Sequence, residues 1–239
     1  FLSLNQMHYC IISAGEGSRL VSEGVSVPKP LVPIAGQPMI GRLMDIMSRC
    51  HCESINVIVN EQMTEVADFV RAYAETSKFP VSLVVKSTPS SMHSFYELSS
   101  IIPGGKFVLT TVDTIFREED FAEYIDAFNR NDYYDAFMAV TTNIDDEKPL
   151  YVETDRNMRI TAFFDAPGAH PKYVSGGIYG LNDRSKEVLN ECIAAGKSRM
   201  RNFQRELLTH GLHAKAWDIG TIIDVDHSSD VEKANAFVA

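Results

Sequence analysis

The residues best suited to chemistry form a loop of small side chains that is followed by two cations. Residues 13–19 read Ser-Ala-Gly-Glu-Gly-Ser-Arg and follow an apolar run, residues 9–12, that predicts a buried strand. Glycines let backbone N–H groups approach an anion closely, and Arg19 adds a charge-assisted contact that suits a phosphate. Lys29 follows between two prolines, which stiffen the backbone around it. This pattern indicates phosphate chemistry.

Three kinds of phosphate-binding loop can be compared with this segment. A dinucleotide-binding fingerprint needs a third glycine, where this chain has Leu20, and a P-loop needs a G-x-x-x-x-G-K-[ST] run, which the sequence lacks. The third kind combines A-G-x-G-[ST]-R-[LM], P-K-P-L and an apolar residue before Gly-x-Pro-Met. All three parts occur in order, at residues 14–20, 28–31 and 34–39. This composite resembles the signature of the sugar-1-phosphate nucleotidyltransferases (NDP-sugar pyrophosphorylases).

The resemblance implies the nucleotide-diphospho-sugar transferase fold and a Mg²⁺-dependent nucleotidyltransferase. Its reaction would join a nucleoside triphosphate to a sugar 1-phosphate, giving an NDP-sugar and pyrophosphate. The catalytic residues would be Arg19, Lys29 and Asp113, with Arg19 on the β- and γ-phosphates and Lys29 at the α-phosphate. The nucleotide-binding residues expected are Ser13, Ala14, Gly15, Gly17, Ser18, Arg19 and Ser91.

Carboxylates for the metal ion are expected at two places in the chain. Asp113 ends the apolar run 107–112 and matches the aspartate that follows a strand in the resembled family, although Val112 replaces the usual glycine before it. Two late acidic runs resemble the family's closing element. The later run opens the last predicted helix, so Asp226 is the first choice for a second ligand, with Asp224 next and Asp218 third. Carboxylates are the ligands that Mg²⁺ prefers.

The acceptor-binding part departs from the family pattern. Residues 175–179, Ser-Gly-Gly-Ile-Tyr, resemble the strand that lines the sugar pocket, but the usual Glu-Lys-Pro appears as Asp-Ala-Pro at 165–167. The lysine that contacts the sugar phosphate is therefore missing, and Lys172 is the nearest substitute. The acceptor-binding residues expected are Glu153, Lys172, Gly176 and Gly177.

The segment that would read the base also departs from the pattern. Residues 89–94, Pro-Ser-Ser-Met-His-Ser, replace the usual Gly-Thr-Ala and look like the counterpart in choline-phosphate cytidylyltransferases of the same superfamily. Two alternatives to a sugar nucleotidyltransferase therefore stay open. One is a cytidylyltransferase acting on phosphocholine or another phosphorylated alcohol, and the other is a non-catalytic, nucleotide-sensing relative.

The order of apolar patterns predicts an α/β fold. Strands at 9–12, 55–59, 81–85, 107–112 and 136–140 alternate with helices at 39–48, 64–74, 92–102 and 121–128. Such alternation implies a Rossmann-like mixed, mostly parallel sheet with helices on both faces and ligands at the carboxyl ends of the strands. From Leu150, short strands at 150–153, 160–164 and 173–179 predict a small antiparallel insertion. Helices at 184–195 and 202–210, a strand at 213–217 and a last helix from 228 complete the pattern.

Composition and net charge limit the classes of molecule that we expect the protein to bind. The chain has 239 residues and a net charge of −10, which disfavours nucleic acid and anionic membrane, since both need basic surface. The expected partners are a nucleoside triphosphate and a phosphorylated small-molecule acceptor, with a homo-oligomer left open. We expect a single nucleotidyltransferase domain over residues 7–239, an N-terminal extension of no assigned role over residues 1–6, and no hexapeptide-repeat domain. Four cysteines without a zinc-type spacing favour reduced thiols and a cytoplasmic location.

Overall fold

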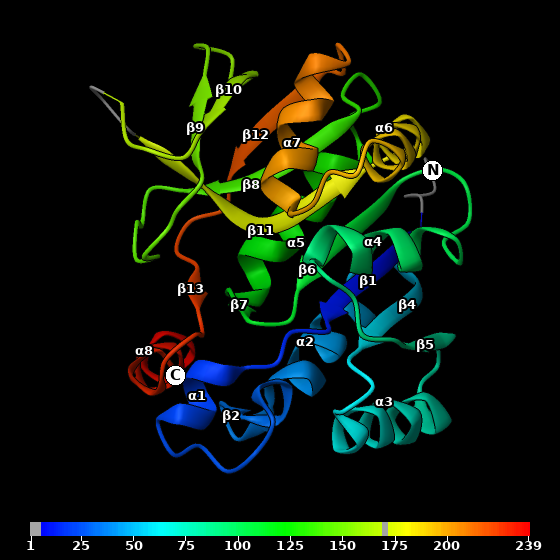
Figure 1. The fold of residues 1–239 in the computed structure, drawn as a ribbon, viewed down its shortest axis with the longest axis vertical. Coiled ribbons are helices and arrows are strands. Elements are labelled where there is room, and N and C mark those ends of the chain that lie inside the picture. The colour runs from blue at the N-terminus through cyan, green and yellow to red at the C-terminus, as the bar shows by residue number, and fades with distance from the viewer. Residues whose placement is uncertain (1–5, 169–171) are drawn as a thin grey trace.

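A mixed nine-stranded sheet forms the centre of the computed structural model, which describes residues 6–168 and 172–239 (Figure 1). The strand order is β10-β9-β11-β6-β1-β4-β5, with β8 also paired to β11 and β12 to β8. The expectation for residues 1–6 lies outside the described residues, except for Gln6. The nine strands are β1 (Met7–Ser13), β4 (Cys52–Val59), β5 (Val81–Val85), β6 (Phe107–Thr111), β8 (Ala136–Thr141), β9 (Tyr151–Thr154), β10 (Ile160–Phe164), β11 (Tyr173–Leu181) and β12 (Ala214–Asp218).

Helices and two short ribbons surround this sheet. The helices are α1 (Ser18–Ser22), α2 (Met39–Ser48), α3 (Thr64–Thr76), α4 (Ser91–Ser99), α5 (Glu118–Asn129), α6 (Asp183–Ala194), α7 (Met200–Thr209) and α8 (Ser228–Val238). A 3-10 turn, η1 (Lys29–Leu31), follows α1. The ribbons are β2 (Pro33–Ile34) with β3 (Gln37–Pro38), and β7 (Thr114–Ile115) with β13 (Ile223–Asp224).

Alternation along the first strand explains why helices cover both faces. Successive strand residues point to opposite faces, so Tyr9 and Ile11 join a core with α2, α3 and α5, whereas Cys10 and Ile12 join a core with α4, α6 and α7. Strands β4, β1 and β6 run parallel, as does β5 beside β4. The predicted Rossmann-like mixed sheet with helices on both faces is confirmed.

One part of the predicted topology is wrong. Strand β11 was expected in the antiparallel insertion, but it lies in the main sheet, antiparallel to both β6 and β8, and only its first residues pair with β9. The insertion is therefore the β9–β10 hairpin alone. The apolar residues predicted this strand correctly, but no local pattern in the sequence shows which strands it pairs with.

A third, smaller apolar cluster holds the segments that follow the strand ends. Leu20 from α1 packs there with Ile115 of β7, Val225 after β13 and Ala234 of α8. Figure 1 shows β13 beside β7, and α8 beside α1. The cluster therefore joins the start of the chain to its end directly below the carboxyl edge of the sheet.

None of the helices in the part of the chain that the structure describes combines the length and the apolar character that a bilayer span requires.

The first prediction concerns the helix that forms one wall of the site. Phe95 of α4 is fully buried, with its ring centroid 5.8 Å from Phe107 and 5.4 Å from Phe203. We expect Phe95→Ala to lower the free energy of unfolding by about 3–5 kcal/mol, because it removes a large core side chain and leaves a cavity. Urea-induced unfolding measures this loss.

Tyr96 provides the matched control on the same helix. Its side chain is 39% exposed, so Tyr96→Ala should cost about 1 kcal/mol or less. Equal losses for the two variants would show that α4 is not anchored through Phe95.

Candidate active site

The glycine loop packs directly against the lysine that follows it. Strand β1 ends at Ser13 and α1 begins at Ser18, so four residues turn the chain over the edge of the sheet. Gly17 has a φ of 61°, and a Cβ there would lie 2.9 Å from Cβ of Lys29. Both the left-handed backbone and the close approach require glycine. The loop and Lys29 therefore form one surface.

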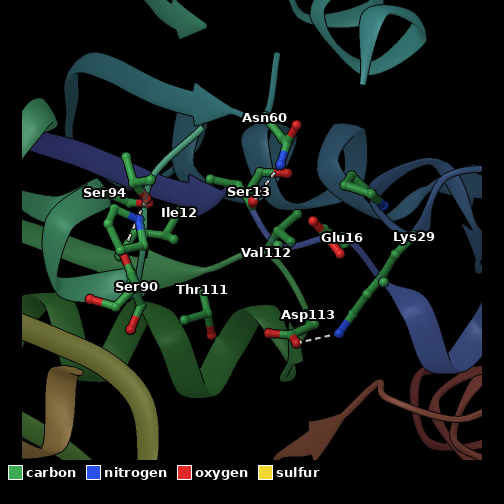
Figure 2. A pocket seen from close by; sticks show the side chains of 17 residues that line it. Ile12, Ser13, Glu16, Lys29, Asn60, Ser90, Ser94, Thr111, Val112 and Asp113 are labelled. Atoms are coloured by element: carbon green, nitrogen blue, oxygen red, sulfur yellow. Dashed lines mark hydrogen bonds and ion pairs between the residues drawn. The ribbon is translucent and has the colours of Figure 1, made fainter. Parts of the chain in front are cut away.

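A cavity of about 400 Å³ opens beside this loop (Figure 2). In the view of Figure 2, Lys29 and Asp113 lie at one end and Ser90 and Ser94 at the other. Of the residues predicted to bind nucleotide, those on its wall are Ser13, Ala14, Gly15, Gly17 and Ser91. The remaining lining residues are Ile12, Glu16, Lys29, Pro30, Asn60, Thr88, Pro89, Ser90, Ser94, Thr111, Val112 and Asp113.

Hydroxyl groups form the far wall of this first cavity. Ser90 precedes α4 and caps it, because its Oγ accepts a hydrogen bond from the backbone N–H of His93 at 3.4 Å. Oγ1 of Thr88 and Oγ of Ser94 lie 2.6 Å apart. Residues 89–94, which depart from the family pattern, thus still form a wall of the cavity, and this wall is rich in hydroxyl groups.

Lys29 links the first cavity to two acids. Its Nζ donates to Oδ2 of Asp113 at 2.6 Å and to Oδ1 of Asp226 at 3.1 Å; Figure 2 shows the lysine reaching toward Asp113. Burial alone would lower the pKa of Lys29, but the two carboxylates outweigh it and raise that pKa. The lysine is therefore a fixed positive charge.

The β7–β13 ribbon explains why acids so far apart in sequence meet here. Asp224 stands opposite Thr114 in the register of the ribbon, and the backbone N–H of Val225 donates to the carbonyl of Asp113 at 3.0 Å. This pairing carries the chain past the end of β6 and delivers Asp226 to Lys29. The sequence showed the two acidic segments but not the ribbon that joins them.

Asp224 lies deeper than Asp226. Its Oδ1 accepts from Oγ1 of Thr114 at 3.4 Å. Burial, followed by the charges of Asp113 and other acids nearby, raises the pKa of Asp224 well above its usual range. The Asp224 carboxyl therefore keeps its proton to a higher pH than an exposed aspartate does.

The other late acids have structural partners. Oδ2 of Asp230 accepts from the backbone N–H groups of Asp226 and His227 at 3.0 and 2.8 Å, which caps the start of α8. Asp218, the third choice for a metal ligand, accepts from the backbone N–H of Gly220 at 3.0 Å and lines neither cavity of the site. The structure therefore brings Asp226, and not Asp218, to Asp113.

A second cavity of about 340 Å³ adjoins the first. The two share Ser91, Thr111 and Asp113 on their walls, so the strand end with Asp113 separates them. Polar groups predominate in the second cavity, whose other lining residues are Asp146, Leu150, Ser175, Gly177, Tyr179, Arg199, Met200, Arg201, Gln204, Asp224 and Asp226.

Two adjacent glycines of β11 allow close packing at the second cavity and directly behind it. Gly177 has a φ of 75°, and a Cβ there would lie 2.8 Å from Oγ1 of Thr114. A Cβ on Gly176 would lie 2.5 Å from Ile222, beside the ribbon strand β13. Of these two predicted acceptor residues, Gly177 lines the second cavity and Gly176 lines a smaller space behind it.

The cations of the second cavity are arginines that the sequence analysis missed. Arg199 and Arg201 flank the start of α7 and line the cavity. Asp165 binds Arg201 at 2.8 Å, so the acid of the altered Asp-Ala-Pro segment holds an arginine near the cavity. Arg199 has a φ of 69°, an unusual backbone for a residue other than glycine. These arginines are far in sequence from residues 165–172, so no local sequence pattern linked them to the acceptor.

Besides Gly176, four predicted site residues lie outside the two cavities. Lys172 is exposed, with its Nζ 4.9 Å from the ring centroid of Tyr173, and Glu153 is exposed and accepts from Thr161. Ser18 lines a separate hollow with Val21 and Met63. None of these, nor Arg19, lies on the wall of either cavity of the site.

Arg19 points along the outside of the site rather than into the first cavity. Its guanidinium lies 3.4 Å from Asp226 and 3.8 Å from Glu147, and about half of the side chain is exposed. Glu23, at the end of α1, accepts hydrogen bonds from Ser228 and His227, which lower the pKa of Glu23 to about 2. These contacts fasten α1 to the start of α8.

The donor set fits a magnesium ion through two carboxylates rather than three. Within residues 6–168 and 172–239, no three His, Cys, Asp or Glu side chains form a metal-binding group, so the set of Asp113, Asp224 and Asp226 is not assembled. Asp113 and Asp226 nevertheless face one cation, the Lys29 ammonium. Mg²⁺ commonly binds one or two carboxylates and completes its shell with water and substrate phosphates.

Comparison with curated proteins shows distant similarity over most of this chain. The chain is 25% identical over 240 residues to the bifunctional protein GlmU of Methanococcus maripaludis strain S2, which covers 96% of this chain and 54% of that protein. A second strain, C5, gives 24% identity over 238 residues with the same coverage. The chain therefore spans about half the length of these relatives.

Solved structures show the same fold. The inositol-1-phosphate CTP transferase from T. maritima aligns with a TM-score of 0.79 and 18% identity, over 98% of both chains. A structure from Bacillus anthracis, described as a "Putative Glucose-1-Phosphate Thymidylyltransferase" in complex with a sucrose, aligns with a TM-score of 0.82 and 21% identity, over 96% of this chain and 94% of that one. The model of the nucleotidyl transferase family matches residues 9–233, which include the glycine loop, Lys29 and the three aspartates. The chain belongs to the nucleotidyl transferase family.

Proposed function

We propose that the protein transfers a nucleotidyl group from a nucleoside triphosphate to a sugar or cyclitol 1-phosphate and releases pyrophosphate. The observation that carries this proposal is the pair of adjoining cavities that share Asp113, with Lys29 at their junction. A reaction between two phosphorylated substrates needs two such sites that meet at one point. The relatives support it, since both structural neighbours are named for a 1-phosphate acceptor.

The chemistry is an attack by an acceptor phosphate oxygen on the α-phosphorus. The new bond joins that oxygen to the α-phosphorus, and the bond from the α-phosphorus to the bridging oxygen of the β-phosphate breaks, so pyrophosphate leaves. Two obstacles oppose this step, because the reacting atoms must be aligned and the two anions repel each other. Cavities on both sides of Asp113 would align the substrates, and the fixed ammonium group of Lys29 would reduce the repulsion. Lys29 would neutralise charge around the α-phosphate.

The proposal includes a divalent cation held by Asp113 and Asp226. Magnesium would supply positive charge to phosphate oxygens during the transfer. Asp226 is better placed for this role than Asp224, because Asp226 shares a partner with Asp113 whereas Asp224 bonds Thr114. Arg19 lies within reach of Asp226, and its contact with the leaving phosphates remains a prediction.

The character of the second cavity favours a phosphorylated ring over phosphocholine. A quaternary ammonium group is usually bound in a cage of aromatic rings. Among the residues described on this cavity's wall, Tyr179 is the one aromatic side chain, and it is almost fully buried. The two arginines suit the phosphate of the acceptor, and the remaining polar groups suit hydroxyls.

A direct test is a screen of nucleoside triphosphates against phosphorylated acceptors, with pyrophosphate release as the readout. We expect turnover with a 1-phosphate of a sugar or cyclitol in the presence of Mg²⁺, and its loss on addition of EDTA. Binding of nucleotide without release of pyrophosphate for any acceptor would instead support the non-catalytic alternative.

The second prediction concerns the shared carboxylate. Asp113→Asn keeps the shape of the side chain but removes the charge that a hard cation needs, so kcat should fall roughly 10²- to 10³-fold with the fold intact. Pyrophosphate release at saturating Mg²⁺ gives the rate, and thermal unfolding reports on the fold. The matched control is Asp218→Asn, which should leave kcat unchanged because Asp218 lies outside both cavities. Normal turnover by the Asp113 variant would remove that residue from the mechanism.

The third prediction separates catalysis from binding at Lys29. Lys29→Ala should lower kcat about 10²-fold and change KM for the triphosphate much less, because a contact made mainly in the transition state registers in kcat. Lys86→Ala, which removes an exposed lysine paired with Glu97, should change neither constant. If Lys29→Ala raised KM alone, the lysine would be a binding residue.

The fourth prediction replaces Lys172 by Arg199 as the cation for the acceptor phosphate. Arg199→Ala should raise KM for the acceptor about 10-fold or more and leave KM for the triphosphate nearly unchanged, because a charge-assisted contact to the acceptor is lost. Lys172→Ala should change neither KM, since Lys172 is exposed outside the cavity. Steady-state kinetics with each substrate varied decides between them, and the opposite ranking would restore Lys172.

A further inference from the structure

Gln204 is a buried polar residue on the wall of the second cavity. Its side chain, on α7, is 1% exposed and lines the cavity together with Ser175. Among the described residues, its amide makes one side-chain hydrogen bond, from Nε2 to Oγ of Ser175 at 3.3 Å, and its carbonyl oxygen makes none. A glutamine amide can make about four.

Unused hydrogen-bonding capacity in a buried amide is costly unless a partner arrives. Asn129 shows the alternative, since its side-chain oxygen and nitrogen are sealed inside the protein without a partner among the described residues. The side-chain oxygen of Gln204 also lacks a partner among the described residues, but it is not sealed in this way, and the residue borders the second cavity. Its unused groups therefore face a place that a ligand can occupy.

We propose that Gln204, supported by Ser175, is a specificity-determining residue that hydrogen-bonds a ring hydroxyl of the acceptor. The inference rests on the proposed function and deepens it, because it names a feature that the acceptor must have. A phosphorylated sugar or cyclitol carries such hydroxyls.

The order of groups along α7 supports a hydroxyl rather than a charged partner. Arg199 and Arg201 lie at the start of the helix, and Gln204 lies one turn further on, about 4.5 Å along the axis from Arg201. The cations suit the phosphate. The neutral amide offers both a donor and an acceptor, which matches a hydroxyl, whereas a quaternary ammonium group could not use it.

The environment of Ser175 fits this role. Ser175 lies on β11 where the pairing with β8 shifts register, so its side chain belongs to the irregular part of the strand next to the glycine pair. Tyr179 lines the same cavity and is 6% exposed. The wall therefore holds an amide and a hydroxyl, joined by a hydrogen bond, with a tyrosine nearby.

The test compares acceptors that differ by one hydroxyl. Glucose, galactose, mannose and N-acetylglucosamine 1-phosphates and myo-inositol 1-phosphate are screened with the wild type, and the best acceptor is then compared with its monodeoxy analogues. For one analogue the wild type should lose about 10- to 100-fold in kcat/KM, because the amide is left unpaired. In Gln204→Leu, which keeps the volume, that same penalty should fall below about 3-fold while penalties for the other analogues remain.

Two further variants keep the test decisive. Ser175→Ala should reduce the same penalty in part, which provides a second measurement if Gln204→Leu does not fold. Asn202→Leu changes an amide on the same helix that lines neither cavity, so it should retain the full penalty.

The outcomes separate this inference from the proposed function. Persistence of every deoxy penalty in both Gln204→Leu and Ser175→Ala would overturn the role of Gln204 while nucleotidyl transfer stands. Turnover of phosphocholine and of none of the ring phosphates would overturn both the role of Gln204 and the proposed class of acceptor, although nucleotidyl transfer itself would stand. If the wild type releases no pyrophosphate with any acceptor, the proposed function fails, and the inference fails with it.

Discussion

The interaction on which the site depends is the placement of one ammonium group between two carboxylates. Lys29 joins Asp113 and Asp226, which lie 84 and 197 residues away in the chain. Without a cation between them, two acids in a half-buried position repel each other, so the lysine is what allows them to converge. The prolines around Lys29, the absence of a side chain on Gly17 and the β7–β13 ribbon are each a condition for this placement.

The position of Asp113 also determines how the two cavities are arranged. Asp113 lies two residues after the end of β6, the strand with parallel β1 on one side and antiparallel β11 on the other. The first cavity opens toward the glycine loop after β1, and the second opens toward the glycine pair in β11. Two bound phosphates would therefore approach each other across the end of one strand. The antiparallel pairing of β11 with β6 places Ser175, Gly177 and Tyr179 on the wall of the second cavity.

The sequence predicted the local features well and the long-range ones only through resemblance. Strand and helix patterns follow from side-chain periodicity, and the loop from Gly15 to Arg19 shows its chemistry in its residue types. The position of β11 and the approach of Asp226 depend on pairing between distant segments, which no local pattern encodes. Lys172 was favoured because it is near the altered segment in sequence, whereas the arginines of the cavity come from α7, some thirty residues later. Magnesium dependence, the cytoplasmic location and an oligomeric state stay predictions.

The balance of charge bears on how an acidic protein would bind the two anionic substrates of the proposed reaction. Asp113, Asp146, Asp224 and Asp226 border the second cavity, while Lys29 and the arginines supply positive charge around it. Substrate phosphates would add more negative charge, so the acids would oppose binding unless a cation came with the substrates. A dication carried by the triphosphate would meet that requirement, and it would give the carboxylates a cationic partner in addition to Lys29. The acids and the phosphates would then not compete with each other, because both would be ligands of the same metal ion.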